Sequence, residues 1–226
     1  MKILVGIPAY NEETMVGKVV RSIPHKIKGV GHIEIVVIDD GSSDRTFYES
    51  KKTGANVIRH LINRGLGGAL KTIFAYAKET DCDILVTFDA DGQHDSSDLP
   101  KIIAPVINYK SDVVIGTRWL LKKNAPFLRK LVNKLANFVT FIFFGISTSD
   151  SQSGFRVFGK KAINSIILTS DGMEVSSEVF KEVKRNRLRL AEVPISPVYT
   201  KYSRAKGQKL SNSINVFIQL LLRLLQ

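Results

Sequence analysis

The sequence predicts an α/β fold built on a mainly parallel sheet, and two observations lead to this prediction. Short apolar runs typical of strands alternate with longer stretches of helical periodicity over residues 1–117. Two of the runs end in acidic residues: Asp39 follows one, and Asp89 and Asp91 follow another. Ligands of open α/β sheets gather at the carboxyl ends of the strands, so these acids lie where a substrate is expected.

The elements follow one another in a regular order over this part of the chain. Helix capping predicts that Ser97 or Asp98 starts the last helix, while Pro24 ends the first. We expect strands at 2–7, 34–39, 56–59, 83–88 and 112–115, with helices at 12–22, 44–52, 66–78 and 98–108. Beyond Gly116 we expect an amphipathic helix at 127–144, a Gly/Ser-rich segment at 151–154, two further helices, a strand near 190–194 and an apolar end at 211–226.

Composition narrows the class of protein. The chain has 226 residues, 44% of them hydrophobic, which suits one large domain or one domain with a short appendage. Its single cysteine, Cys82, excludes a disulfide framework and favours a reducing compartment. Residues 1–7 form a short strand-like run rather than a long apolar segment, so we expect no signal peptide.

The net charge of +12 is concentrated in the second half of the chain. Residues 118–160 carry eight Lys and Arg against one acid, and residues 181–226 carry ten against two. This asymmetry indicates either an anionic partner or a solvated basic face. Charge alone favours the solvated basic face. Of the two anionic partners considered, nucleic acid and an anionic membrane surface, nucleic acid is supported by no zinc spacing, helix-turn-helix signal or aromatic-basic repeat.

Two stretches, 127–144 and 211–226, combine apolar and basic residues at helical spacing. Neither reaches the roughly 20 apolar residues of a membrane span. They are typical of helices that lie in a membrane interface, while core packing or a dimer contact explains the pattern equally well. The second stretch is also compatible with the start of a membrane region.

The motif Asp89-Ala90-Asp91-Gly92-Gln93-His94 follows a buried strand and is the most informative feature. Side chains two residues apart on an extended segment point the same way, so both carboxylates can face one cation. Mg²⁺ or Mn²⁺ is typically held by one or two carboxylates together with substrate phosphates. The motif therefore predicts a metal-bound diphosphate site, in which His94 is interpreted as a turn residue without a catalytic step.

Three further segments have both a functional and a structural interpretation. The turn from Pro8 to Glu13 can stack on a base, or it can be a helix start that Asn11 caps. The turn from Asp39 to Asp44 can bind ribose or base, or it can be a polar loop with Asp44 as N-cap. The glycines of 63–69 can cradle phosphate, but they lack the spacing of a Walker or dinucleotide loop, so close helix packing is favoured.

Taken together, six motifs in this order resemble the family 2 glycosyltransferases: PAYNEE, DDGSSDRT, NRGLGGAL, DADGQH, GTRW and SQSGFR. The strongest likeness is to the polyprenyl-phosphate sugar transferases, such as dolichyl-phosphate mannose or glucose synthases. The resemblance implies a GT-A type fold and inverting, Mg²⁺- or Mn²⁺-dependent transfer of a hexose to dolichyl or polyprenyl phosphate. The donors implied are GDP-mannose, UDP-glucose or UDP-N-acetylglucosamine.

The same resemblance implies a domain organisation and a location. Residues 1–210 are expected to form the catalytic domain, with a nucleotide-sugar half at 1–117 and an acceptor half at 118–210. Residues 211–226 are expected to form a C-terminal amphipathic helix or the stump of a membrane region, because many family members continue into membrane helices. The expected location is the cytoplasmic face of a membrane, bound peripherally or through such a region.

Site residues also carry over where the motifs match. Expected nucleotide-sugar contacts are Pro8, Tyr10, Glu12, Asp39, Asp89, Ala90, Gln93, Arg204 and Lys209. Expected metal ligands are Asp89, Asp91 and Gln93. Expected acceptor-phosphate contacts are Arg118, Arg129, Asn133, Ser153 and Arg156, and the catalytic set is Asp91, Arg118 and Arg129.

Two alternatives remain at this stage. A family 2 enzyme with a hydroxyl acceptor needs a general base, and Glu174 and Glu178 are the nearby late candidates. A lipid phosphate is already anionic and needs arginines instead of a base. A receiver-like phospho-switch also places acids at strand ends, but it needs about half this length and leaves the basic half unexplained.

Overall fold

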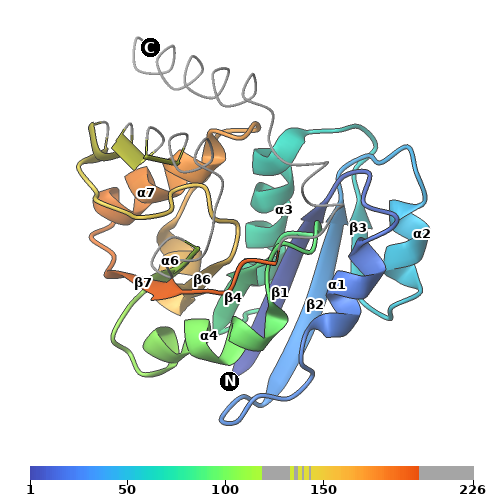
Figure 1. Cartoon of the computed structure of the whole chain (residues 1–226), viewed down its shortest axis with the longest axis horizontal. Helices are drawn as coiled ribbons and strands as arrows, with labels where there is room; N and C mark the ends of the chain where they lie inside the picture. Colours follow the sequence, from blue (N-terminus) through green and yellow to red (C-terminus); the bar gives the residue numbers. More distant parts are fainter. Residues whose placement is uncertain (119–132, 135–136, 139, 143, 199–226) are drawn as a thin grey trace.

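The computed structural model describes residues 1–118, 133–134, 137–138, 140–142 and 144–198. At its centre is one seven-stranded sheet with the order β3-β2-β1-β4-β6-β5-β7 (Figure 1). Paired neighbours run parallel, except that β6 is antiparallel to both β4 and β5. The strands are β1 (Lys2–Ala9), β2 (His32–Asp39), β3 (Asn56–Arg59), β4 (Ile84–Thr87), β5 (Val113–Thr117), β6 (Arg156–Gly159) and β7 (Leu190–Pro194). The predicted mainly parallel α/β fold is confirmed.

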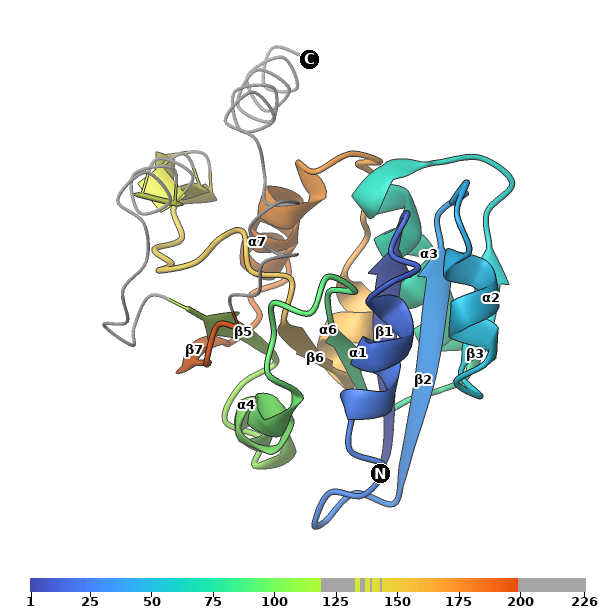
Figure 2. The same ribbon diagram turned by 45° about the vertical axis from the view of Figure 1, so that its right-hand side comes forward.

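Helices cover both faces of the sheet (Figure 2). Alternation along β1 explains the two layers, because Leu4 packs into the core under α3, α6 and α7, while Ile3 and Val5 pack into the core under α1 and α4. The helices are α1 (Val16–Ser22), α2 (Thr46–Lys51), α3 (Gly65–Glu79), α4 (Leu99–Ile107), α6 (Lys160–Ser165) and α7 (Val175–Arg185), and a 3₁₀ turn η1 (Ser96–Asp98) precedes α4.

One predicted helix start and one predicted helix cap are wrong. Helix α1 begins at Val16 rather than at residue 12, because Asn11 has a left-handed φ of 54° and the next residues form a turn. The start of α4 is not capped by the side chain of Ser97 or Asp98. Instead Asp95 caps η1 by accepting the Ser97 N–H, and the Asp98 carboxylate accepts the N–H of Ser196 at 2.6 Å.

Strand β6 was not predicted. It has four residues, all buried, and it begins with a charged residue, Arg156, so neither its length nor its first side chain marks it as a strand. Antiparallel pairing with β4 and β5 places it inside the sheet, directly after the Gly/Ser-rich segment.

The glycine-rich start of α3 packs closely, as predicted. The N–H groups of Gly67 and Gly68 donate to the carbonyl oxygen of Asp171 at 2.7 and 3.2 Å. A Cβ on Gly67 would collide with the carbonyl of Ser170. These amides are therefore engaged by the protein itself and are not a phosphate cradle.

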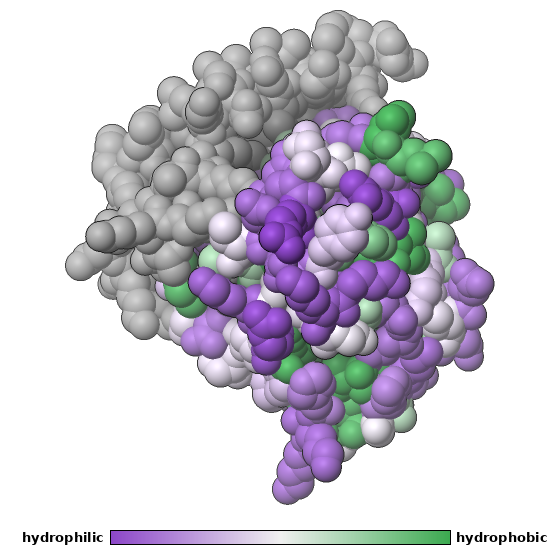
Figure 3. Space-filling view, turned by 90° about the vertical axis from the view of Figure 1, so that its right-hand side faces the viewer, coloured by the Kyte–Doolittle hydropathy of each residue, from purple (hydrophilic) through white to green (hydrophobic). Residues whose placement is uncertain are grey.

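The surface is mostly hydrophilic on the side of β3 and α2, with separate hydrophobic patches (Figure 3). Leu61 and Ile62, which follow β3, are 101% and 71% exposed. Among the residues that the structure describes, none of the helices has the length and hydropathy of a membrane span.

Candidate active site

The carboxyl ends of β1 and β2 lie side by side, since Ala9 pairs with Asp39 in the parallel register. Asp39 is fully buried and accepts the N–H of Ser42 at 3.1 Å. Its other oxygen, Oδ2, is 3.1 Å from Nε of Arg59 but accepts no aligned hydrogen bond from the described residues. The predicted nucleotide residue Asp39 thus has acceptor capacity left at this edge.

The loops after β1 and β2 are tied together by polar contacts. The N–H of Ser43 donates to Oδ1 of Asn11 at 3.0 Å, so Asn11 binds the neighbouring loop rather than a helix end. Asp44 caps α2 by accepting the N–H of the first helical residue at 2.9 Å. Tyr10 is 47% exposed and Glu12 is 8% exposed, so of these two predicted donor contacts Tyr10 is the one open to a ligand.

Asp89 is held by His94, a residue that sequence reasoning interpreted only as part of a turn. His94 Nε2 lies 2.9 Å from Asp89 Oδ2. The imidazole is fully buried, and its ring centroid lies 5.4 Å from the rings of both Phe88 and Phe155. The turn interpretation is corrected: His94 is a buried partner that fixes the orientation of Asp89.

The two acids of the motif have opposite pKa shifts. Burial raises the pKa of Asp89, but the hydrogen bond and charge of His94, with the charges of Arg118 and Arg156, outweigh it and hold the pKa below its usual range. Burial, followed by the negative charge of Asp89, raises the pKa of Asp91. Two carboxylates that repel each other in a partly desolvated site form a natural cation site.

The ligand set at this motif is small. Gln93 donates its backbone N–H to Asp91 at 2.9 Å and its side-chain amide to the other Asp91 oxygen at 2.5 Å. Across the described part of the chain, no group of three or more His, Cys, Asp and Glu side chains is arranged to hold a metal ion. Asp89 and Asp91 remain predicted ligands of an ion such as Mg²⁺, which takes one or two carboxylates and completes its shell with phosphate and water.

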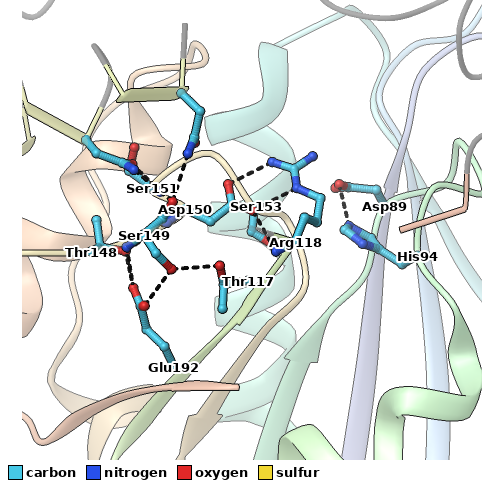
Figure 4. A network of polar contacts seen from close by, with 12 residues as sticks. Asp89, His94, Thr117, Arg118, Thr148, Ser149, Asp150, Ser151, Ser153 and Glu192 are labelled. Carbon is cyan, nitrogen blue, oxygen red and sulfur yellow. Dashed lines mark hydrogen bonds and ion pairs between the residues drawn. The ribbon is translucent and has the colours of Figure 1, made fainter. Parts of the chain in front are cut away.

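On the other side of Asp89 lies Arg118, at the end of β5 (Figure 4). Its Nε and Nη2 both bind the buried carboxylate of Asp150 at 2.8 Å. The side chain of Arg118 is 20% exposed, and its charge acts on Asp89. A bidentate pair of this kind fixes the plane of the guanidinium group.

The segment 148–151 that carries Asp150 is itself held by polar groups (Figure 4). The Glu192 carboxylate of β7 accepts the hydroxyl groups of Thr148 and Ser149 and the Ser149 N–H, at 2.5–2.7 Å. The carbonyl oxygen of Ser149 accepts the side-chain amides of Asn133 and Asn137, both at 2.8 Å. Asn133, a predicted acceptor contact, thus holds this loop through its amide nitrogen.

Arg156, another predicted acceptor contact, is only 3% exposed. Its Nε and Nη2 donate to the carbonyl oxygens of Ser153 and Ser151 at 2.7 and 2.8 Å, and the guanidinium lies over the ring of Phe180. Burial lowers its pKa to about 10, against the charges of Asp89 and Asp150, so it stays cationic at neutral pH. Arg156 therefore holds the segment 151–153 through its backbone and adds positive charge near Asp89.

Comparison with known proteins identifies this arrangement. Residues 4–167 match the family described as Glycosyl transferase family 2. The chain belongs to glycosyl transferase family 2. It is therefore a glycosyltransferase, and the resemblance predicted from the six motifs is confirmed.

Several relatives have a named activity, and two of them show the likeness. The chain is 38% identical to the UDP-N-acetylglucosamine--dolichyl-phosphate N-acetylglucosaminyltransferase of Methanococcus voltae, over 96% of this chain and 93% of that one. It is 33% identical to the dolichol-phosphate mannosyltransferase of Pyrococcus furiosus, over 96% of this chain and 61% of that one.

Among solved structures, glucosyl-3-phosphoglycerate synthase from Mycobacterium tuberculosis, crystallised with Mn²⁺ and UDP, superimposes with a TM-score of 0.73 at 21% identity. The match covers 99% of this chain and 78% of that one. The glycosyltransferase therefore has the predicted GT-A-like fold.

Several predicted site residues of the glycosyltransferase meet at one cavity. It lies between α3, α7 and the carboxyl ends of β1 and β4, and its enclosed part, about 20 Å³, has room for about one water molecule. Pro8, Asp89, Ser153 and Arg156 all contribute to its walls. Predicted residues that lie outside the described part of the chain are Arg129, Arg204 and Lys209, together with the stretch 211–226.

Glu178, a candidate general base for a hydroxyl acceptor, is committed to a structural contact. Its Oε1 accepts the N–H and the hydroxyl of Thr169 at 2.9 and 2.5 Å, and its Oε2 accepts the N–H of Ser170 at 2.9 Å. Burial raises the pKa of Glu178, but these hydrogen bonds outweigh it and hold the pKa below its usual value. The other candidate, Glu174, is also buried.

Proposed function

We propose that this glycosyltransferase moves a sugar from a nucleoside-diphosphate sugar to the phosphate of a polyprenyl or dolichyl phosphate, with inversion and with Mg²⁺ or Mn²⁺ as cofactor. The named relatives from two archaea act on dolichyl phosphate. The single observation that carries the proposal is that Arg118 lies opposite Asp89 of the acidic motif (Figure 4), and that its positive charge helps to lower the pKa of Asp89. One side suits a metal-bound diphosphate and the other an incoming anion.

The reaction is a single displacement at the anomeric carbon. An oxygen of the acceptor phosphate forms the new bond to this carbon, while the bond to the diphosphate oxygen breaks and the nucleoside diphosphate leaves with the electron pair. The attacking oxygen is already an anion, so no proton has to be removed. This agrees with the hydrogen-bonded, structural role of Glu178.

The proposed roles combine position with the resemblance of the motifs. Tyr10 and Asp39 take the nucleoside, Asp89, Asp91 and Gln93 hold the cation, and Arg118 attracts the acceptor phosphate. When a divalent cation is bound there, it neutralises charge on the departing diphosphate. Asp150 and Glu192 keep Arg118 and its loop in place.

The acceptor lipid implies a membrane surface. The described residues between 133 and 144 are helical, with Asn133 buried and Phe138, Phe141 and Ile142 between 52% and 59% exposed. These three exposed apolar side chains are available for contact with a membrane interface. The unpaired Cys82 fits a reducing compartment, in agreement with the cytoplasmic face.

The test is sugar transfer with the full chain, Mn²⁺ or Mg²⁺, a panel of labelled donors and polyprenyl phosphate in detergent. We expect labelled lipid in the organic phase, and Asp91→Asn to lower its formation at least about 100-fold at saturating metal. The matched control is Asp83→Asn, at the amino end of the same strand and half exposed, which should keep activity. Label that appears only on a soluble glycan, or full activity of Asp91→Asn, contradicts the proposal.

A further inference from the structure

The loop between β3 and α3 exposes two consecutive aliphatic side chains. Leu61 is 101% exposed and Ile62 is 71% exposed. The side of the molecule that carries β3 and α2 is mostly hydrophilic (Figure 3). Single exposed apolar residues are common on protein surfaces, but two adjacent ones that project from a loop indicate contact with something outside the chain. We call this pair, Leu61 and Ile62, the β3 tip.

Both ends of the β3 tip are anchored to one buried carboxylate. Asp40 is 4% exposed, and its two oxygens accept the backbone N–H groups of Arg64 and Gly65 at 2.9 and 2.8 Å. Before the tip, Nδ1 of His60 lies 2.6 Å from Asp40 Oδ1, and Nε2 of the same ring lies 2.9 Å from the hydroxyl of Thr72. The exposure of the two side chains between these anchors is therefore built into the fold.

The backbone of the β3 tip packs on the loop that follows β2. A Cβ added to Gly41 would lie 2.6 Å from the carbonyl carbon of Ile62 and 2.6 Å from the backbone nitrogen of Asn63. Gly41 also has a φ of 71°, a conformation that favours glycine. The two loops thus meet backbone to backbone, while the aliphatic side chains of the tip project into solvent.

The surroundings of the β3 tip are positively charged. Residues 50–78 contain six Lys and Arg and no acid. Arg64 is exposed, and its guanidinium group has no partner among the residues that the structure describes. Asp171, which contacts the start of α3, forms an ion pair with Lys71. Apolar side chains next to uncompensated positive charge are typical of a segment that enters the interface of an anionic membrane.

The same charge argues against a second copy of this chain as the partner. A symmetric contact would place one β3 tip and its basic surroundings against those of the other copy. Like charges would then face each other around four aliphatic side chains, an area far below that of a stable protein interface. A membrane interface needs no such area, because each basic residue and each buried methylene group adds to the binding.

The β3 tip lies at the same end of the molecule as the proposed site. Asp39 pairs with Arg59, the last residue of β3, and its carbonyl oxygen accepts the N–H of His60 at 2.9 Å. Figures 1 and 2 show the loop between β3 and α3 and the described part of 133–144 at this end, on opposite sides of β1. A membrane in contact with both would lie across the site edge, where a lipid-borne phosphate has to enter.

We propose that Leu61 and Ile62 insert into the interface of an anionic membrane. They give the nucleotide half of the enzyme a membrane contact of its own, so that the carboxyl edge of the sheet faces the bilayer. The inference rests on the proposed function, because the lipid acceptor is the reason to dock in this orientation.

The direct test is a fluorescent label on the β3 tip of the full chain. Cys82, the single cysteine of the sequence, is fully buried, so an environment-sensitive thiol dye will react with Leu61→Cys. The matched control is Tyr109→Cys, which is 78% exposed and precedes the amino end of β5, at the opposite edge of the sheet. With vesicles of phosphatidylcholine and phosphatidylglycerol in equal amounts, we expect a blue shift of the emission at residue 61 and none at residue 109.

Unlabelled variants separate the apolar from the electrostatic contribution. Leu61→Ser/Ile62→Ser should weaken partition into the mixed vesicles at least about tenfold. Arg64→Gln should weaken the same partition about fivefold and leave partition into pure phosphatidylcholine unchanged. Tyr109→Ser should behave as wild type. All variants should bind UDP with Mn²⁺ as wild type does, which shows that the nucleotide site is intact.

An unshifted dye at residue 61, an equal shift at residue 109, or full partition of Leu61→Ser/Ile62→Ser overturns the inference. Loss of UDP binding in that double variant also overturns it, because the tip would then serve the nucleotide. A shift at residue 61 that follows protein concentration without vesicles makes a second copy the partner and overturns it too.

The outcome is separable from that of the proposed function. A vesicle-dependent shift at residue 61 without formation of a lipid-linked sugar supports the membrane contact and refutes the acceptor. Formation of a lipid-linked sugar with an unshifted dye does the reverse.

Discussion

The variant Glu178→Gln tests whether the carboxylate of Glu178 has a structural or a catalytic role. The glutamine keeps one of the two side-chain oxygens and replaces the other with an NH₂ group. This NH₂ group faces the backbone N–H of Thr169 or of Ser170, each of which donates to the carboxylate in the wild type. Hydrogen bonds to a charged group contribute about 1.5–3 kcal/mol each, and the loss also leaves a buried N–H without an acceptor. We expect the free energy of unfolding to fall by about 2–4 kcal/mol, which lowers Tm by about 5–15 °C in a chain of this size.

The same variant changes the pH dependence of stability. The folded-state pKa of Glu178 lies below 4.5, so its contribution is complete above pH 4.5 and is lost as pH falls through the folded-state pKa. Glu178→Gln should therefore lose stability at pH 7 and approach wild type in acid. Calorimetry between pH 3 and 7 measures this, and a double-mutant cycle with Thr169→Val isolates the hydroxyl contact.

Activity gives the decisive result for Glu178. Assayed well below its Tm, Glu178→Gln should retain kcat within about threefold of wild type, since the carboxylate anchors a loop and takes no proton. Loss of a general base would instead lower kcat by about 10²–10⁴. A fall of that size with unchanged Tm would refute the structural role and revive the hydroxyl-acceptor alternative.

The remaining predictions concern packing, the membrane and surface charge. Gly67→Ala drives a methyl group into a backbone carbonyl and should lower Tm by at least about 5 °C; a Tm equal to wild type would show that the contact relaxes freely. The double variant Phe138→Ser/Phe141→Ser should weaken sedimentation with anionic vesicles several-fold and leave UDP binding intact, whereas unchanged sedimentation argues against an interface role. Arg189 lowers the pKa of Asp112, and Asp112→Asn breaks this ion pair. Because the side chain of Arg189 is 57% exposed, we expect the free energy of unfolding to fall by less than about 1 kcal/mol at pH 7, and this difference to disappear toward pH 3. Chemical denaturation measures the difference, and activity should be unchanged.

Local pattern was sufficient to predict the part of the site that lies at strand ends. The apolar run before Asp89 leads to a strand, and the topology of a parallel sheet then brings Asp39 to the same edge. Both acids lie at this edge because parallel strands end on the same side of the sheet, so the direction of the chain is sufficient to place them there. Their roles as ligands remain predictions, but their common edge follows from local sequence.

Contacts between distant segments were beyond this reasoning. His94 contacts Asp89 within the same turn, but its ring also packs against Phe155, the residue just before the unpredicted strand β6. Asp150 and Glu192 were missed for the same reason. One signal was present, since Asp150 is the one acid among eight basic residues in 118–160, and a lone acid in such a segment favours an internal ion pair.

The contacts that three acids make in the second half of the chain favour the proposed phosphate acceptor. Asp150 is neutralised by Arg118, Glu192 is saturated by hydroxyl groups, and Glu178 anchors a loop. Within the described residues, the carboxylates of these three are thus committed to holding the scaffold together. A hydroxyl acceptor that used one of these three as its base would need that carboxylate released, at the cost of an unpaired buried charge or donor. An acceptor that is already an anion makes no such demand, which agrees with the proposed role of Arg118 in attracting it.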